Sequence, residues 1–234
     1  MLSNGWTSRP WPFEERFHQT NFAIAQAIAF LDSRDRDAPF FLSVGMVAPH
    51  PPLVPPACYY DRYARVQLDQ PVVGDWVPEP APPSGAAVDA PEMVLSPAAS
   101  QLARAGYYGS INHVDDQLAL LLERLRIENE PTLLIFTSDH GEMLGDHHCF
   151  RKALPFEPAA RIPMIVAGPD VPAGVVCDRP VGLLDILPTC LRRAGVEPPF
   201  QPDGIDLVEA ATGDASRRDW MHLEHAPLRH RWGG

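Results

Sequence analysis

The sequence lacks long apolar runs and has few basic residues. No stretch approaches the roughly 20 consecutive apolar residues that a membrane-spanning helix needs. The first residues, MLSNGWTSRPWPFEERFH, have neither a basic start nor an apolar core, so no export signal is visible and a cytoplasmic location is the default expectation. The 19 Lys and Arg residues against 30 Asp and Glu residues give a net charge of -11, which repels phosphate backbones and anionic lipids. The sequence therefore predicts neither a membrane span nor a nucleic-acid partner.

Closely spaced cysteines are also missing. Four cysteines are scattered along the chain without any CxxC spacing: Cys58, Cys149, Cys177 and Cys190. This pattern indicates neither a zinc cage nor a dense disulfide framework, so we expect reduced thiols. Proline, by contrast, is abundant, with 27 residues that cluster most strongly within residues 64–97. Because proline removes a backbone donor and disfavours helix at the preceding residue, we expect a long surface excursion there.

Between the proline clusters, hydrophobic periodicity predicts a helix over residues 20–34, with Thr20 or Asn21 as its cap, and two more over residues 96–127 and 181–195. In the second helix an apolar stripe is expected from Ile111, Val114, Leu118, Leu121, Leu122 and Leu125. Short, continuously apolar runs at residues 39–47, 132–138 and 162–169 predict strands that are buried on both faces. Apolar strands separated by helices predict an α/β fold, a three-layer α/β/α sandwich around a mostly parallel mixed sheet.

In such sheets ligands gather beyond the carboxyl ends of the strands. His50 follows the first predicted strand, and Asp139 and His140 follow the second. A carboxylate and an imidazole at that position can reach one cation. Taken alone, Asp139 could equally cap a turn beside a surface histidine. His50 among prolines could likewise be an ordinary exposed side chain, and Lys152 could be half of a solvated basic pair with Arg151.

Other polar groups are weaker candidates. Asp146, His147 and His148 could orient the turn after Asp139 and His140 by hydrogen bonding, but a surface loop explains them equally well. Asp115 and Asp116 lie beside the apolar stripe of a predicted helix, so a solvated face accounts for them better than a pair of acid and base catalysts. Near the end, His222 and Glu224 share one face of a predicted strand with His225 on the other, which does not gather three ligands.

Four ordered segments carry a resemblance to a known family: PFFLSVGMVAPHPPLVPP, YYGSINHVDDQLALLLERL, TLLIFTSDHGEMLGDHHCFRKALPFEPAARIPMIVAGP and VGLLDILPTCLRRAGVEPPFQPDGIDL. In sequence, order and approximate spacing they resemble the arylsulfatase-like sulfatase family of the alkaline phosphatase superfamily. The resemblance implies an alkaline phosphatase-like fold and hydrolysis of small-molecule or glycan sulfate esters. It also implies a formylglycine nucleophile, made from Cys or Ser, beside a divalent cation that is calcium in most members.

Four positions match residues with roles in that family. By this resemblance Asp139 and His140 are metal ligands, while His50 and Lys152 bind the sulfate group and take part in catalysis. A cation, an ammonium and an imidazolium would stabilise the negative charge that grows on sulfate oxygens as the ester bond breaks. The chain departs from the family pattern at Pro158, in a stretch that the family leaves open to helix.

The segment that carries the nucleophile in the family, Cys or Ser, any residue, Pro, any residue, Arg, has no counterpart in these 234 residues. We therefore expect residues 1–234 to be a partial catalytic domain, without the nucleophile-bearing first portion and the carboxyl-terminal subdomain. Weak metal binding and self-association through exposed sheet edges would follow. A phosphonate monoester or phosphodiester hydrolase of the same superfamily, or a non-catalytic truncated relic, remains an alternative.

Overall fold

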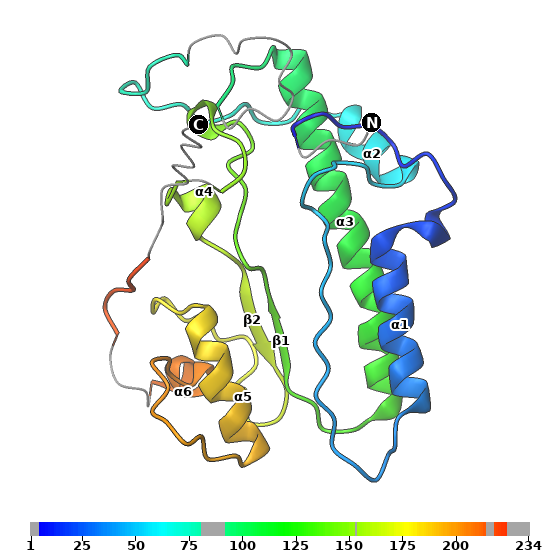
Figure 1. Ribbon diagram of the computed structural model, residues 1–234, viewed down its shortest axis with the longest axis vertical. Helices are drawn as coiled ribbons and strands as arrows, with labels where there is room; N and C mark the ends of the chain where they lie inside the picture. Colours follow the sequence, from blue (N-terminus) through cyan, green and yellow to red (C-terminus); the bar gives the residue numbers. More distant parts are fainter. Residues whose placement is uncertain (1–4, 81–91, 153, 214–217, 224–234) are drawn as a thin grey trace, which may run out of the picture. The chain divides into compact units, whose positions relative to one another are not determined.

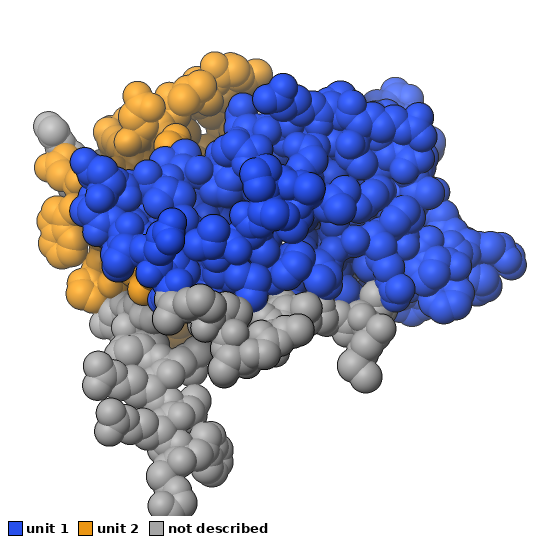
Figure 2. Space-filling model, turned by 90° about the horizontal axis from the view of Figure 1, so that it is seen from above, with its two compact units in different colours: residues 1–130, 143–151 blue, residues 131–142, 152–234 orange. Residues whose placement is uncertain are grey.

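The computed structural model describes residues 5–80, 92–152, 154–213 and 218–223 (Figure 1). The predicted excursion at residues 64–97 is therefore described except for residues 81–91, and Glu224 and His225 lie outside the described residues. The chain divides into two compact units, residues 1–130 with 143–151 and residues 131–142 with 152–234 (Figure 2). The elements along the chain are η1 (Glu15–Phe17), α1 (Gln19–Ser33), α2 (Ala57–Ala64), α3 (Pro97–Glu128), β1 (Leu134–Thr137), η2 (Asp146–His148), α4 (Glu157–Ala160), β2 (Met164–Ala167), η3 (Leu183–Asp185), α5 (Ile186–Ala194) and α6 (Leu207–Thr212).

The core of the first unit forms where α1 packs along α3 (Figure 1). Its buried members are Ile24, Ala27 and Leu31 of α1 and Leu121 of α3. The first three are spaced by three and four residues, which places them on one helical face. The predicted cap of this helix is wrong. His18 precedes the helix, and its Nδ1 accepts a hydrogen bond from the backbone N–H of Thr20 at 3.2 Å.

The long helix α3 confirms the prediction for residues 96–127. Ser96 caps it by accepting a hydrogen bond from the N–H of Ala99 at 3.2 Å, and Asn129 ends it in the left-handed conformation. The predicted apolar stripe is only partly correct. Val114 and Leu121 are buried, whereas Ile111 and Leu122 are 44% and 49% exposed. A straight helix of 32 residues drifts away from any single neighbouring helix, so its apolar positions do not all meet the core.

The predicted strand at residues 39–47 is extended but has no ladder partner among the described residues. Its side chains still alternate. Phe40, Leu42, Val44 and Met46 pack against the core of α1 and α3. A period of two therefore persists without a sheet, because the apolar row is held by helices rather than by backbone pairing.

The second unit contains β1 and β2, which pair antiparallel with Leu134 opposite Ala167 and Thr137 opposite Met164. Both strands lie where the sequence predicts them. Within the described residues this antiparallel pair is the whole sheet, so the parallel pairing expected from the sequence is not seen there. The chain between β1 and β2 holds no helix longer than the four residues of α4, so it does not form the helical crossover that usually joins parallel strands.

The predicted helix at residues 181–195 begins as the 3-10 turn η3 and continues as α5. Arg192 and Arg193 lie in its last turn, and Gly195 ends it with a φ of 66°, as expected. Among the described helices, none combines the length and hydropathy that a bilayer crossing requires.

Candidate functional site

The turn after β1 places a carboxylate oxygen and an imidazole nitrogen side by side. His140 Nδ1 lies 2.8 Å from the carbonyl oxygen of Gly141. Because a carbonyl only accepts hydrogen bonds, we assign the proton to Nδ1, which leaves the lone pair of a neutral ring on Nε2. His140 Nε2 is 3.4 Å from Asp139 Oδ2. Asp139 Oδ1 accepts from the backbone N–H of His140 at 3.0 Å, so Oδ2 is the oxygen that faces the imidazole nitrogen.

Two such atoms can share one cation. Metal–ligand bonds of about 2.0–2.5 Å are compatible with ligand atoms roughly 3 Å apart. A histidine ligand commonly donates its other ring N–H to a carbonyl group, as His140 does to Gly141. Within the described residues, however, no group of three or more His, Cys, Asp or Glu side chains is placed to hold a metal ion. This pair is thus a partial ligand set.

The polypeptide then makes a closed loop, residues 143–151. Its ends are joined by a hydrogen bond from the N–H of Met143 to the carbonyl oxygen of Arg151 at 2.8 Å. Lys152 therefore leaves the loop beside the point where Glu142 enters it, two residues after His140. The chain following His140 is also fixed in its own unit, because the N–H groups of Gly141 and Glu142 donate to Ala159 and Pro158 at 2.8 and 2.9 Å.

Pro158 takes part in this local geometry. A Cβ added to Gly141 would lie 2.0 Å from the carbonyl oxygen of Pro158, so a side chain at this position would force the two segments apart. The stretch after Lys152 forms the short helix α4, with Pro158 in its first turn. The departure from the family pattern at Pro158 thus leaves a helical turn in place.

The backbone of the loop is unusual. Leu144, His147, His148 and Arg151 have φ values of 45°, 52°, 60° and 70°, and Gly145 has a φ of 96°. Non-glycine residues in the left-handed region each cost on the order of 1–3 kcal/mol, and they persist only where surrounding contacts hold them. Four of them within eight residues mark a segment that is tightly constrained.

The contacts that hold the loop come from α3 and from the proline-rich excursion. Asp146 Oδ1 accepts from Arg104 Nη2 of α3 at 3.0 Å and from the N–H of Val72 at 3.0 Å. The N–H of His147 donates to the carbonyl oxygen of Val72 at 2.8 Å, and His147 Nδ1 accepts from the N–H of Gly74 at 3.2 Å. Asp146 and His147 therefore tie the loop to the excursion by hydrogen bonds, one of the two roles that the sequence left open for them.

Arg104 is a structural partner that the sequence did not indicate. It is buried on α3, and it lies 42 residues away from Asp146 along the chain. Only the count of like and unlike charges could have suggested such a pair, and that count does not identify partners. By contrast, Asp115 and Asp116 are exposed on α3, as expected. Burial, followed by a hydrogen bond to Asp116, raises the pKa of the Tyr59 hydroxyl above its ordinary range.

His50 lies in the other unit, at the end of the extended segment. Its N–H donates to the carbonyl oxygen of Val47 at 2.9 Å, and its Nδ1 is 2.7 Å from the carbonyl oxygen of Pro51. By the argument used for His140, Nδ1 carries a proton and Nε2 is the nitrogen that exchanges one. Asp139, His140 and Lys152 belong to the same unit. The convergence of all four residues on one anion stays a prediction.

Comparison with known proteins identifies the family. The family model described as Sulfatase matches residues 3–196. An arylsulfatase of Clostridium perfringens is 38% identical over 235 residues, covering 95% of this chain and 48% of that protein. The chain spans about half the length of the curated relatives it matches.

Two solved structures are also similar, both at 27% sequence identity. A phosphonate monoester hydrolase from Silicibacter pomeroyi has a TM-score of 0.72, with 93% of this chain and 48% of that chain covered. A phosphonate monoester hydrolase of Agrobacterium radiobacter has a TM-score of 0.76, with 91% and 46% covered. These likenesses confirm the predicted α/β, alkaline phosphatase-like fold class. Since the matched region is well over half of the sequence, the chain belongs to the sulfatase family.

Proposed function

We propose that this chain carries the sulfate-binding and late metal-binding part of a sulfate ester hydrolase. The observation that carries the proposal is the pairing of Asp139 Oδ2 with His140 Nε2 at 3.4 Å, followed by a closed loop that returns the chain at Lys152. The tightly constrained backbone of that loop supports it, because strained segments cluster at functional sites. The substrate would be a small-molecule or glycan sulfate ester.

Asp139 and His140 would hold a divalent cation. The cation would supply Lewis acidity toward a sulfate oxygen. Calcium is the expected ion by family resemblance, but calcium prefers six to eight oxygen ligands, whereas an imidazole nitrogen suits manganese or zinc better. Two protein ligands bind any of these ions weakly, and a metal titration should distinguish them.

Lys152 and His50 would act on the substrate directly. The Lys152 ammonium makes no ion pair with any described residue, so its charge is available to a sulfate oxygen. His50, with Nδ1 held by the carbonyl oxygen of Pro51, would hold a proton at Nε2 and give it to the leaving alcohol oxygen. In the family the attack on sulfur comes from a formylglycine, whose precursor motif does not occur in these 234 residues.

The metal part is tested by calorimetric titration of the chain with Ca²⁺, Mn²⁺ and Zn²⁺. We expect weak binding that Asp139→Asn abolishes. Asp178→Asn is the matched control, since Asp178 is an exposed carboxylate of the same unit. Tight, stoichiometric uptake of calcium, or equal binding by Asp139→Asn, would contradict this assignment.

The substrate part is tested by equilibrium binding of an aryl sulfate. Removing a charge-assisted contact costs about 1.5–3 kcal/mol, so Lys152→Ala should weaken binding by roughly tenfold or more. Arg161→Ala is the control, because the Arg161 side chain is 84% exposed in the same unit. Unchanged binding in Lys152→Ala would remove this residue from the site.

A second candidate is hydrolysis of phosphonate monoesters. It is favoured by the two phosphonate monoester hydrolases whose folds match at TM-scores of 0.72 and 0.76. Both ester classes present a tetrahedral anionic group, so the same lysine and cation suit either. Competition between an aryl sulfate and an aryl phosphonate monoester for the chain ranks them, and preferential binding of the phosphonate would favour this alternative.

A further inference from the structure

Residues 40–46 form an extended segment with unpaired backbone, called here the 40–46 edge. No backbone–backbone hydrogen bond joins these residues to any other residue that the structure describes. The even-numbered side chains pack on α1 and α3, while Phe41, Ser43 and Gly45 are exposed. The segment thus has the alternation of a strand and an open hydrogen-bonding edge.

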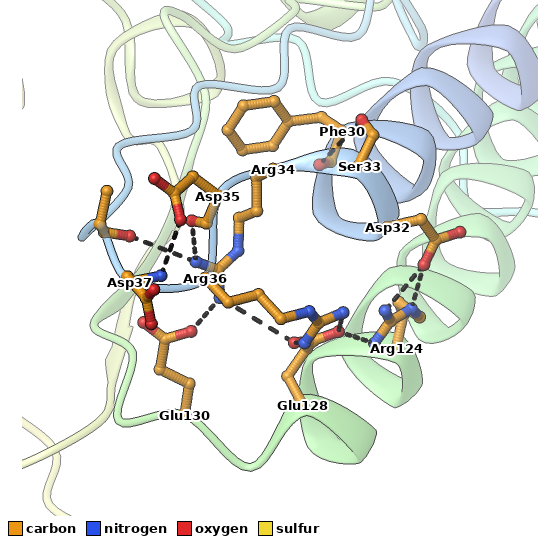
Figure 3. A network of polar contacts seen from close by, with 11 residues as sticks. Phe30, Asp32, Ser33, Arg34, Asp35, Arg36, Asp37, Arg124, Glu128 and Glu130 are labelled. Carbon is orange, nitrogen blue, oxygen red and sulfur yellow. Dashed lines mark hydrogen bonds and ion pairs between the residues drawn. The ribbon is translucent and has the colours of Figure 1, made fainter.

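Both ends of this edge are fixed. Before it, Arg34 and Arg36 form ion pairs with Glu130 and Glu128 near the end of α3 (Figure 3). The Arg34 guanidinium also lies 4.6 Å from the centre of the Phe40 ring. After it, the N–H of His50 donates to the carbonyl oxygen of Val47 at 2.9 Å, and Leu53 forms a parallel bridge with Ser8. The segment is therefore already extended, and pairing it costs little additional conformational entropy.

The 40–46 edge also lacks the features that normally protect an unpaired strand. From residue 38 to residue 49 the sequence has no charged side chain, and its prolines lie only at positions 39 and 49. Natural sheets protect exposed edges with lysine, with proline inside the edge, or with a bulge. Phe41 is instead 78% exposed. An edge of this kind is suited to accept another strand.

The sequence of the edge is complementary to itself. In an antiparallel pair of two copies centred on Ser43, residue 40 lies opposite 46, residue 41 opposite 45, and residue 42 opposite 44. Every even-numbered residue then faces an even-numbered one, so both apolar rows stay on one face. A shift that pairs even with odd positions would reverse the faces. Among the registers that keep the faces, this one pairs the most residues.

The exposed face fits the same register. It places Phe41 of each copy over Gly45 of the other, a pairing in which an aromatic ring covers a glycine on an open edge. Around Gly45 no other side chain or backbone of the described residues comes within 4 Å of where a Cβ would stand, so the space for the ring is open. Ser43, at the centre, lies opposite itself.

We propose that two copies of this chain associate through the 40–46 edge, as an antiparallel strand pair centred on Ser43. This inference does not depend on the proposed catalytic function. Because each chain carries a net charge of -11, the two copies repel each other, so association should strengthen as salt screens that repulsion.

Sedimentation velocity of the full 234-residue chain tests the proposal. The expected result is a concentration-dependent dimer that is tighter at high salt. Ser43→Lys would place two like charges directly opposite each other and should give a monomer with an unchanged circular dichroism spectrum. Gln19→Lys, the same charge change at an exposed position of α1, should remain dimeric. A monomer at every concentration, or a dimer that survives Ser43→Lys, would overturn the proposal. A monomer would leave the edge to a strand of another polypeptide.

A cross-link tests the register. With the exposed thiols replaced by Cys58→Ser and Cys177→Ser, Ser43→Cys should form an intermolecular disulfide in mild oxidant, because opposite residues have Cβ atoms ~4.5–5.5 Å apart. Phe41→Cys should not, since the two copies of residue 41 would be roughly 13 Å apart, four residues along the strand. Equal cross-linking of both variants would overturn the register.

Discussion

The two units of the chain are held together by different kinds of core. In the first unit the centre is apolar: Ile24, Ala27 and Leu31 from α1 meet Leu121 from α3, all at most 7% exposed. In the second unit the centre is a carboxylate. Asp185 is fully buried and accepts hydrogen bonds from the N–H groups of Gly182 and Ile205, both at 2.8 Å.

This carboxylate also holds distant parts of its unit together. Arg218 donates to both oxygens of Asp185, at 2.8 and 2.9 Å, in a two-pronged contact. The Thr189 hydroxyl donates to the Asp185 carbonyl oxygen at 2.6 Å and accepts from the N–H of Leu207 at 2.8 Å, which links α5 to the start of α6. The four polar partners thus come from segments up to 33 residues apart.

The difference follows from the lengths of the elements. The helices α1 and α3, with 15 and 32 residues, can bury a continuous apolar face. The elements of the second unit have nine residues or fewer, and Leu184, Leu187 and Ile165 remain exposed. A unit that cannot bury much apolar surface depends more on one satisfied polar network. Stability should therefore be distributed in the first unit and concentrated in the second.

The largest test of this contrast is Asp185→Ala. Removing one member of a buried ion pair leaves the other without a partner and costs about 3–5 kcal/mol. Amide hydrogen exchange should show protection lost across residues 131–142 and 152–223 and retained in α1 and α3. Asp178→Ala, at an exposed position of the same unit, should change nothing measurable. Equal loss in both units would mean that they unfold as one.

Leu31→Ala is the converse change. Leu31 is fully buried between α1 and α3, and truncation of such a leucine costs about 2–5 kcal/mol through lost burial and the remaining cavity. Exchange should then increase in α1 and α3 while the Asp185 network stays protected. Leu120→Ala on the exposed face of α3, where the side chain is 54% exposed, is the control.

Acid should also act on the first unit selectively, through His113. This histidine is fully buried on α3, its ring centre lies 4.7 Å from that of His18, and neither of its ring nitrogens has a hydrogen-bond partner. Glu15, Asp116, Tyr59 and Cys58 are the other titratable groups around this pair. Burial, and then the neighbouring His18, lowers the pKa of His113 from 6.5 to about 4. Burial also lowers the pKa of His18.

The sign of the effect follows from which state takes up the proton. Above pH 6.5 His113 is neutral in both states. Between pH 6.5 and about 4 the unfolded chain binds a proton that the folded chain does not, so stability falls with decreasing pH by at most about 1.4 kcal/mol per pH unit for this group. His113→Leu should flatten that part of the profile in urea titrations. His222→Gln, at an exposed position, should leave it unchanged, and a wild-type slope in His113→Leu would contradict the assignment.

The smallest effect concerns the start of α3. Ser96→Ala removes the hydroxyl that accepts from the N–H of Ala99 and should lower stability by about 1 kcal/mol. Ser96→Asp should retain the cap, because a carboxylate accepts the same hydrogen bond and interacts favourably with the helix dipole. Thermal unfolding of the two variants checks this prediction, and equal losses would show that the cap contributes little.

Much of the fold follows from local patterns that the sequence displays directly. The helix at residues 96–127 and the strands β1 and β2 were predictable because periodicity and capping depend on neighbouring residues. The candidate site residues Asp139, His140, His50 and Lys152 were recognisable through ordered motifs. Their geometry was not. The 3.4 Å approach of Asp139 to His140 depends on which nitrogen of the ring faces the Gly141 carbonyl, and that is set by the turn.

By itself, the sequence determined the α/β class, the places of the main helices and strands, and membership of the sulfatase family, since each is encoded by residues close together in the chain or by their order. Only the tertiary structure decided that residues 40–46 pair with no described strand, that His113 is buried beside His18, and that Arg104 meets Asp146. Those outcomes depend on groups many residues apart. Whether a polar group is paired and whether a strand has a neighbour are properties of the space around a residue, which no local pattern specifies.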